Sequence, residues 1–255
     1  MALIITLQQS IMIEANKLTK IYGNFLATKE ISFHVGKGEV ACFLGPNGAG
    51  KSTTMKMLTG FLAPSSGTAK IAGFDMISDR EQGAKKLGYL PENGPIYPDM
   101  TPETLLKFFA ELRQLPSSQR KSRIDEVVEL CELQSVFHRP LGSLSKGFRQ
   151  RVGMAQALLH DPDVVILDEP TAGLDPNQIQ HVRTTIKRIG RTKTVLLSTH
   201  ILQEVKAVAS RIVFISDGRI VFDGPVEEFG ETTDDLDRQF QKLTANRLNR
   251  YLSRK

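Results

Sequence analysis

The chain has 255 residues, a formal net charge of +5 and two cysteines. This length allows one large α/β domain, or one domain with an inserted subdomain. The mild positive charge suits a nucleotide, an anionic membrane surface or nucleic acid and selects none of them. Two cysteines exclude a disulfide-rich fold and favour a reducing compartment. No apolar run approaches the roughly 20 residues that cross a bilayer, so we expect a cytosolic protein.

Two stretches near the N-terminus, residues 13–18 and 31–35, alternate apolar and polar side chains. The alternation predicts two half-buried antiparallel strands. Tyr22 lies in the loop between them. Its ring could stack on a flat base or simply cover the strand edge, and its position alone leaves both interpretations open.

A glycine-rich loop follows the apolar run 40–44 and precedes a helical pattern that Gly60 ends. The order strand, glycine loop, helix is the context in which such a loop binds phosphate, because its backbone N–H groups surround the oxygens at the positive end of the helix. A turn that only relieves backbone strain leaves the Lys-Ser pair unexplained. We predict that Lys51 meets the β- and γ-phosphates and that Ser52 ligates Mg²⁺. The loop reads Gly45-Pro46-Asn47-Gly48-Ala49-Gly50-Lys51-Ser52-Thr53.

A turn at 64–67 leads to predicted strands at 68–71 and 87–90. The next segment, Pro91-Glu92-Asn93-Gly94-Pro95, is too rich in proline and glycine for regular structure. A polar loop that leaves a buried strand beside a phosphate site is suited to a metal or water contact. It could equally be an ordinary connector, and the local sequence leaves both interpretations open.

From Thr101 the pattern becomes helical. Thr101 is a predicted N-cap with Pro102 at the first helical position, and apolar residues follow at three- and four-residue steps. A second amphipathic helix contains residues 124–131. Because these helices interrupt an alternation of strands and helices, we predict a helical subdomain over about residues 93–160.

Within this insert, Ser145 is a predicted N-cap of a further helix. Gly147 leaves backbone amides of its first turn open to an anion. The cations Arg149 and Arg151 oppose the helix dipole unless a negative group is nearby. A capped helix with a basic first turn is the alternative interpretation.

Four consecutive apolar residues, 164–167, are followed directly by Asp168 and Glu169. The pattern is typical of a central parallel strand whose C-terminal end faces a ligand crevice. Two adjacent acids there need a cation. We predict that Asp168 holds Mg²⁺, directly or through water, and that Glu169 is the general base for attack of water on the γ-phosphate. A solvated acidic loop is the alternative, and the phosphate loop upstream argues against it.

A turn containing Asp175 precedes a helix with apolar residues at 179, 182, 186 and 189. Another buried strand is predicted at 194–198, and His200 follows it. A lone histidine after a strand is more often structural, but this one leaves the sheet at the edge where parallel α/β sheets bind ligands. A hairpin signal at 216–218 closes the core, and residues 225–255 predict a short helical tail.

These motifs, in this order over about residues 13–224, resemble the nucleotide-binding subunits of ATP-binding cassette (ABC) transporters. Residues 45–53 resemble the Walker A motif, and 164–169 resemble the Walker B strand with its catalytic glutamate. Residues 172–175 resemble the D-loop, which adds Asp175 to the nucleotide site, and His200 resembles the switch histidine. Ser145 and Gly147 occupy the phosphate-facing positions of the family signature, and Tyr22 that of the adenine-stacking aromatic.

The resemblance implies ATP and Mg²⁺ as cofactors and ATP hydrolysis as the activity. The implied fold is an α/β P-loop NTPase, with a RecA-like parallel sheet core, an antiparallel β subdomain and an inserted α-helical subdomain. The cassette is expected to span residues 12–224, with the helical tail 225–255 outside it.

Two departures from the family pattern concern the signature and one loop. Lys146 and Phe148 replace the third and fifth residues of the usual L-S-G-G-Q, and Glu92 stands where a glutamine is expected. Both departures resemble exporter ATPases related to gliding-motility, multidrug and sodium-export systems, in which the membrane protein is a separate chain. We hypothesise that Glu92 ligates the metal in place of the amide oxygen. The alternative is that Glu92 points toward the permease and tunes coupling.

The resemblance further implies a head-to-tail dimer with a second copy or a paralogous cassette. ATP on Lys51 of one subunit would be covered by Ser145 and Gly147 of the other. The implied function is ATP hydrolysis that powers a separately encoded permease, with this chain peripheral at the cytoplasmic face of the inner (plasma) membrane.

The rival interpretation is a soluble ABC ATPase that acts on nucleic acid or ribosomes. Relatives of that kind resemble tandem cassettes or cassettes split by long coiled coils, whereas this chain has one uninterrupted cassette, so no nucleic acid is expected. A non-hydrolysing regulatory subunit would lack Glu169 or His200, and both are present.

Overall fold

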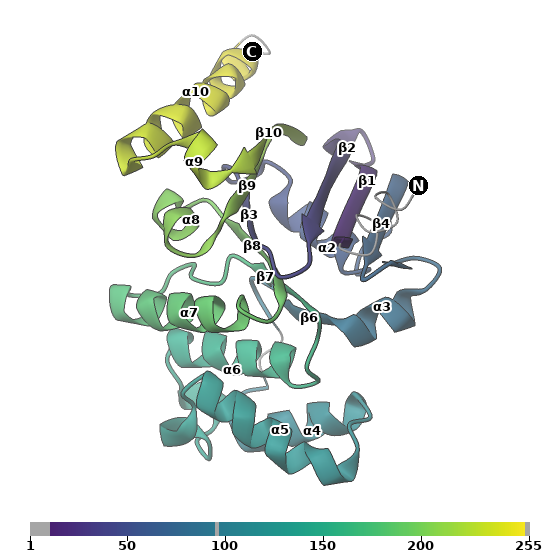
Figure 1. Cartoon of the computed structure of the whole chain (residues 1–255), viewed down its shortest axis with the longest axis vertical. Coiled ribbons are helices and arrows are strands. Elements are labelled where there is room, and N and C mark those ends of the chain that lie inside the picture. Colours follow the sequence, from purple (N-terminus) through teal and green to yellow (C-terminus); the bar gives the residue numbers. More distant parts are fainter. Residues whose placement is uncertain (1–10, 95–96, 253–255) are drawn as a thin grey trace.

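A computed structural model describes residues 11–94 and 97–252, with side chains placed as far as residue 244. Its centre is a six-stranded sheet of order β10-β9-β3-β8-β7-β6 (Figure 1). The pairs β9–β3, β3–β8, β8–β7 and β7–β6 are parallel, and β10 is antiparallel to β9. The carboxyl ends of the parallel strands therefore share one edge. The strand bounds are β3 Val40–Leu44, β6 Leu87–Leu90, β7 Val164–Asp168, β8 Thr194–Thr199, β9 Arg211–Ser216 and β10 Arg219–Pro225.

A second sheet is antiparallel, with the order β2-β1-β4-β5. Its strands are β1 Ile11–Tyr22, β2 Phe25–Gly36, β4 Ser66–Ile71 and β5 Phe74–Asp75. The antiparallel pairing predicted from the two alternating stretches is confirmed, and both strands are longer than the alternation indicated. Helix α2, Lys51–Leu58, contacts strands of both sheets.

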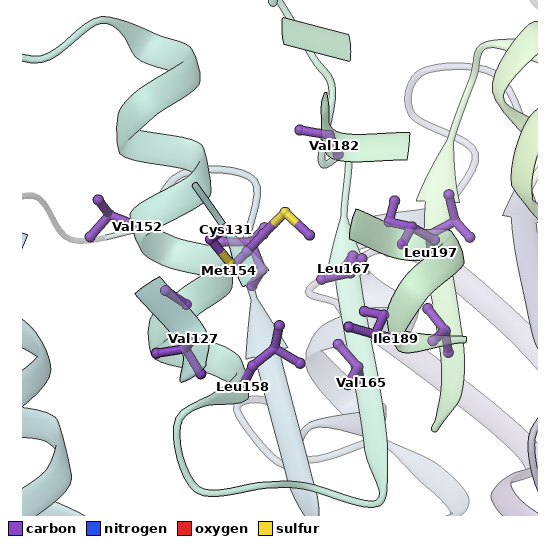
Figure 2. Close-up of a cluster of buried hydrophobic side chains, with 14 of the residues drawn as sticks. Val127, Cys131, Val152, Met154, Leu158, Val165, Leu167, Val182, Ile189 and Leu197 are labelled. Carbon is purple, nitrogen blue, oxygen red and sulfur yellow. The ribbon is translucent and has the colours of Figure 1, made fainter. Parts of the chain in front are cut away.

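The parallel sheet is buried on both faces. Along β7, Val165 and Leu167 belong to one apolar cluster, while Val164 and Ile166 belong to the other. The first cluster includes α6 Lys146–Leu158 and α7 Pro176–Ile189, and Figure 2 shows Leu158 and Ile189 beside Val165. The second cluster includes residues of α2 and of the antiparallel sheet. Burial on both faces explains why the strand is a continuous apolar run.

Further helices lie beyond α6, at the end of the molecule away from the antiparallel sheet (Figure 1). Thr101 caps the first of them as predicted, because its side chain accepts from the Thr104 N–H in a capping box with Pro102 next in the chain. Ser145 caps α6 by accepting from the Phe148 N–H at 3.3 Å. The boundaries of a helical subdomain at about 93–160 stay a proposal. These helical elements are α4 Pro102–Leu112, α5 Ser117–Leu130, η1 Gln134–Val136 and η2 Leu141–Ser143, and α3 Arg80–Lys86 precedes β6.

The C-terminal segment is helical, as expected. After α8, Leu202–Val208, and the β9–β10 hairpin, it forms α9 Val226–Phe229 and α10 Thr233–Leu252. The ring centre of Phe240 lies 5.3 Å from that of Phe214 in β9, so α10 packs against β9. Among the described residues, no helix combines the length and the apolarity needed to cross a bilayer.

Candidate active site

The glycine loop leaves β3 and enters α2 at the carboxyl edge of the parallel sheet. The Gly45 N–H donates to the Thr199 carbonyl at 3.3 Å, and a Cβ at Gly45 would lie 2.3 Å from the Ile215 carbonyl oxygen. Gly50 precedes the helix with φ 108°, a left-handed conformation, and a Cβ there would meet the Ala27 carbonyl oxygen at 2.8 Å. Glycine at both positions brings the backbone N–H groups at the start of α2 to the loop interior, where an anion can be held.

A cavity of about 420 Å³ opens at this loop. Its lining comes from segments far apart in the sequence, which meet because parallel strands end at one edge. The lining residues are Phe25, Ala27, Asn47, Gly48, Gly50, Lys51, Ser52, Thr53, Glu92, Glu169, Ala172 and His200.

Lys51 is the buried cation of this cavity, with 6% of its surface exposed. Its ammonium donates to the Gly45 carbonyl at 2.8 Å and the Pro46 carbonyl at 3.3 Å. It also lies 3.1 Å from Glu169 Oε1. The ion pair keeps both buried charges compensated, and it places the ammonium where it can meet phosphate oxygens.

Glu169 has φ 49°, in the left-handed region, which costs a non-glycine residue about 1–3 kcal/mol. Its backbone N–H donates to the Ser198 side chain at 3.0 Å, which holds the turn after β7 against β8. The carboxylate is 8% exposed and its Oε2 lies 2.9 Å from His200 Nδ1. Lys51 and His200 thus contact one oxygen each, and the carboxylate is fixed in the cavity wall.

Asp168 lies behind this pair, at the end of β7. Its Oδ1 accepts from Ser198 Oγ at 2.5 Å and from Ser52 Oγ at 3.4 Å. Burial raises the pKa of Asp168, opposed by these two hydrogen bonds. A buried carboxylate beside a serine hydroxyl fits Mg²⁺, which prefers oxygen ligands and completes its shell with water and phosphate. Within residues 11–94 and 97–252, no group of three or more His, Cys, Asp or Glu could hold a metal by itself.

Glu92 is exposed and lines the same cavity. Burial raises the pKa of nearby Tyr89, and the charges of Asp168 and Glu92 raise it further, so both acids lie near one phenol. The described structure contains no hydrogen bond between Glu92 and Ser52 or Asp168. Its role as a metal ligand stays a prediction.

The predicted aromatic Tyr22 does not line the cavity. It pairs with Phe25 across the β1–β2 hairpin, and Lys20 Nζ lies 5.5 Å from its ring centre. Phe25, 64% exposed, lines the cavity instead. Sequence reasoning missed Phe25, although an apolar ring directly after the Gly23-Asn24 turn is a signal for an exposed aromatic. It also missed Ser198, a polar residue next to the last position of an apolar strand.

Ser145, Gly147 and Asp175 also lie outside the cavity lining. They gather where α6 and α7 begin: a Cβ at Gly147 would meet Gln178 Cδ at 2.4 Å, and Asp175 Oδ1 accepts from the Gln178 N–H at 2.9 Å. Lys146 Nζ would lie 2.6 Å from a Cβ at Gly173. Apart from Tyr22, the predicted residues therefore fall into two groups, one around Lys51 and one where α6 and α7 begin.

A parallel sheet whose glycine loop, buried lysine and adjacent acids meet at one edge defines a P-loop nucleoside triphosphatase. Comparison with known proteins gives the family. The ABC transporter family pattern matches residues 28–172, more than half of the chain. The chain therefore belongs to the ABC transporter family, as an ATP-binding subunit with ATPase activity.

Individual relatives agree with this assignment. The ABC transporter ATP-binding protein NatA of Bacillus subtilis is 36% identical over 84% of this chain and 89% of its own. Nod factor export ATP-binding protein I of Paraburkholderia xenovorans is 36% identical over 83% of this chain and 70% of its own. A solved ATP-binding subunit of an ABC transporter superposes with a TM-score of 0.81 at 27% identity, over 90% of this chain and 99% of that one.

Proposed function

We propose that this chain hydrolyses MgATP to power a separately encoded membrane permease of the exporter type. The observation that carries the proposal is the contact chain Lys51–Glu169–His200, with distances of 3.1 and 2.9 Å, at the mouth of the glycine loop. Export is supported by similarity to a relative named for Nod factor export. The separate permease is supported by similarity to relatives that are named as ATP-binding proteins of transport systems.

The first step is the binding of ATP to the loop. Its phosphates accept hydrogen bonds from backbone N–H groups at the start of α2, and the Lys51 ammonium turns from Glu169 to the β- and γ-phosphates. Ser52 and Asp168 would hold Mg²⁺. When bound, the ion offsets the charge of the phosphate oxygens during transfer.

The second step is hydrolysis, in which Glu169 is the general base. Once Lys51 faces phosphate, Glu169 Oε1 is free to accept a proton from the water that attacks the γ-phosphorus. His200 holds Oε2 and so orients the carboxylate. The left-handed backbone at Glu169 directs this side chain into the cavity rather than along the strand.

Closure of the site comes from a second cassette, either another copy or a paralogue. Ser145 and Gly147 lie outside the cavity of their own subunit, and the first turn of α6 offers backbone N–H groups to an anion. In a head-to-tail dimer they cover the ATP of the partner. The chain then acts at the cytoplasmic face of the membrane as a peripheral subunit, with the cassette at residues 12–224.

The test compares Glu169→Gln and Lys51→Ala with wild type in Mg²⁺-dependent ATP hydrolysis, ATP binding and light scattering. Glu169→Gln should lose about 10²- to 10⁴-fold in kcat, retain ATP affinity and accumulate as an ATP-bound dimer. Lys51→Ala should lose ATP affinity itself. Glu227→Gln, an exposed acid of α9, is the matched control. Wild-type turnover in Glu169→Gln would refute the assignment of the base.

Coupling to a permease needs its own measurement. The gene adjacent to the one for this chain is co-expressed with it. If that gene encodes a membrane protein, ATP hydrolysis by this chain is measured with and without that protein in vesicles. Stimulation by a six-helix membrane protein that co-purifies with the chain supports the transporter function. A ribosomal or repair protein as the co-purifying neighbour contradicts it.

A further inference from the structure

A buried acid in α8, Glu204, lies behind the two loops that carry Glu169 and His200. The residue is 1% exposed. Its Oε2 accepts from Thr199 Oγ1 at 2.7 Å, and its Oε1 accepts from Thr171 Oγ1. Both threonines are buried, at 0% and 3% exposure. One carboxylate thus joins side chains that are 28 positions apart in the sequence, Thr171 and Thr199.

This carboxylate has no cationic partner among the described residues. The donors on it are the two hydroxyl groups, and it lies in the first turn of α8, where the helix dipole favours a negative charge. Burying an acid without an ion pair is costly, and an apolar side chain would fill the same space at lower cost. The arrangement is therefore explained by the hydrogen bonds that the acid accepts.

The two threonines are adjacent to the groups that act in hydrolysis. Thr171 lies two residues after Glu169, in a turn closed by the hydrogen bond from the Ala172 N–H to the Glu169 carbonyl at 3.1 Å. Thr199 directly precedes His200. Thr199 Oγ1 also accepts from the Ile201 N–H at 3.1 Å, so its own proton is directed to Glu204.

We propose that Glu204 is a positioning residue for ATP hydrolysis. By tying the turn after β7 to the end of β8, it keeps Glu169 Oε2 and His200 Nδ1 at their 2.9 Å contact. Glu204 does not line the cavity, so it acts through the two loops. The inference rests on the roles proposed above for Glu169 and His200.

The experiment replaces each threonine by valine, which has nearly the same shape but no hydroxyl, and by serine, which keeps the hydroxyl. Thr171→Val should lower kcat by about tenfold or more while the dissociation constant for ATP stays close to wild type, because the reacting groups shift and the phosphate loop does not. Thr171→Ser should retain kcat. Thr199→Val and Thr199→Ser should give the same contrast, and Glu204→Gln should lower kcat as Thr171→Val does.

Two controls separate positioning from loss of stability. Val205→Ala removes buried apolar atoms from the same helix and should lower Tm while retaining kcat, and Gln203→Ala changes an exposed neighbour and should alter neither. All kcat values are measured well below the Tm of each variant. The inference would be overturned if Val205→Ala and Thr171→Val lowered Tm equally and also lowered kcat equally.

Glu169→Gln is measured in parallel so that the two proposals can fail separately. If Glu169→Gln loses kcat while both valine variants keep it, Glu204 is structural only and this inference is wrong. If Glu169→Gln itself turns over at the wild-type rate, the proposed role of the base is wrong, and the inference about Glu204 fails with it.

Discussion

Acid should destabilise this protein through one histidine outside the candidate active site. His160 follows α6, and its Nε2 lies 3.0 Å from the Leu87 carbonyl, so Nε2 carries the proton. Its Nδ1 is buried and has no hydrogen-bond partner among the residues that the structure describes. Burial, together with the charges of Arg113, Arg123 and Lys193, lowers the pKa of His160 to about 4, although the hydrogen bond to Leu87 opposes the shift. A second proton on this ring would face cations and no acceptor.

The sign and size of the effect follow from linkage. The folded pKa, about 4, is below the reference value of 6.5, so the unfolded chain binds more protons at acidic pH. The stability from neutral His160 is fully present above pH 6.5 and is lost as the pH falls from there toward 4. Between pH 7.5 and pH 5 these two pKa values give a loss of about 2 kcal/mol in the free energy of unfolding.

Urea unfolding of wild type and His160→Gln at pH 7.5 and pH 5 measures this loss. Glutamine can still donate to the Leu87 carbonyl and does not titrate, so the variant should lose about 2 kcal/mol less than wild type on acidification. His34→Gln, which removes an exposed histidine of β2, should lose as much as wild type. Equal losses in wild type and His160→Gln would refute the reasoning.

Three further predictions concern the site. Glu92→Gln should retain ATPase activity with a shifted Mg²⁺ dependence if the acid ligates the metal, and superimposable Mg²⁺ titrations would exclude that role. Asp168→Asn should raise the Tm of the protein without nucleotide and abolish Mg²⁺-dependent turnover. Burial raises the pKa of Asp168, so its contribution to folding stability is present in acid and is lost as the pH rises through the folded pKa. Asparagine stays neutral, and its side-chain oxygen can still accept a hydrogen bond from Ser198. An unchanged Tm would contradict this. Gly45→Ala puts a Cβ 2.3 Å from the Ile215 carbonyl oxygen. The substitution should lower the free energy of unfolding, measured in urea, by about 1–3 kcal/mol. Wild-type stability would show that β3 and β9 can move apart there.

Local sequence determined the elements of this protein and the order of its motifs. A run of four apolar residues indicated the buried strand that ends at Asp168, and a threonine followed by proline indicated the start of α4 after Thr101. Such signals are readable because helix caps and strand alternation depend on residues within a few positions of one another. The two cysteines, Cys42 and Cys131, are free and buried, which agrees with the reducing compartment that their small number favoured.

Tertiary structure alone decided which of these residues meet. The pairing of β7 with β8 brings Ser198 onto Asp168, and that of β3 with β8 brings Gly45 to Thr199. The spacing of residues along the chain does not predict either contact, because strands that pair can be far apart in the sequence. Whether Tyr22 or Phe25 faces the cavity depends in the same way on the hairpin and its neighbours. The hydrogen bonds on Glu204 needed three elements to fold together before any of them could form.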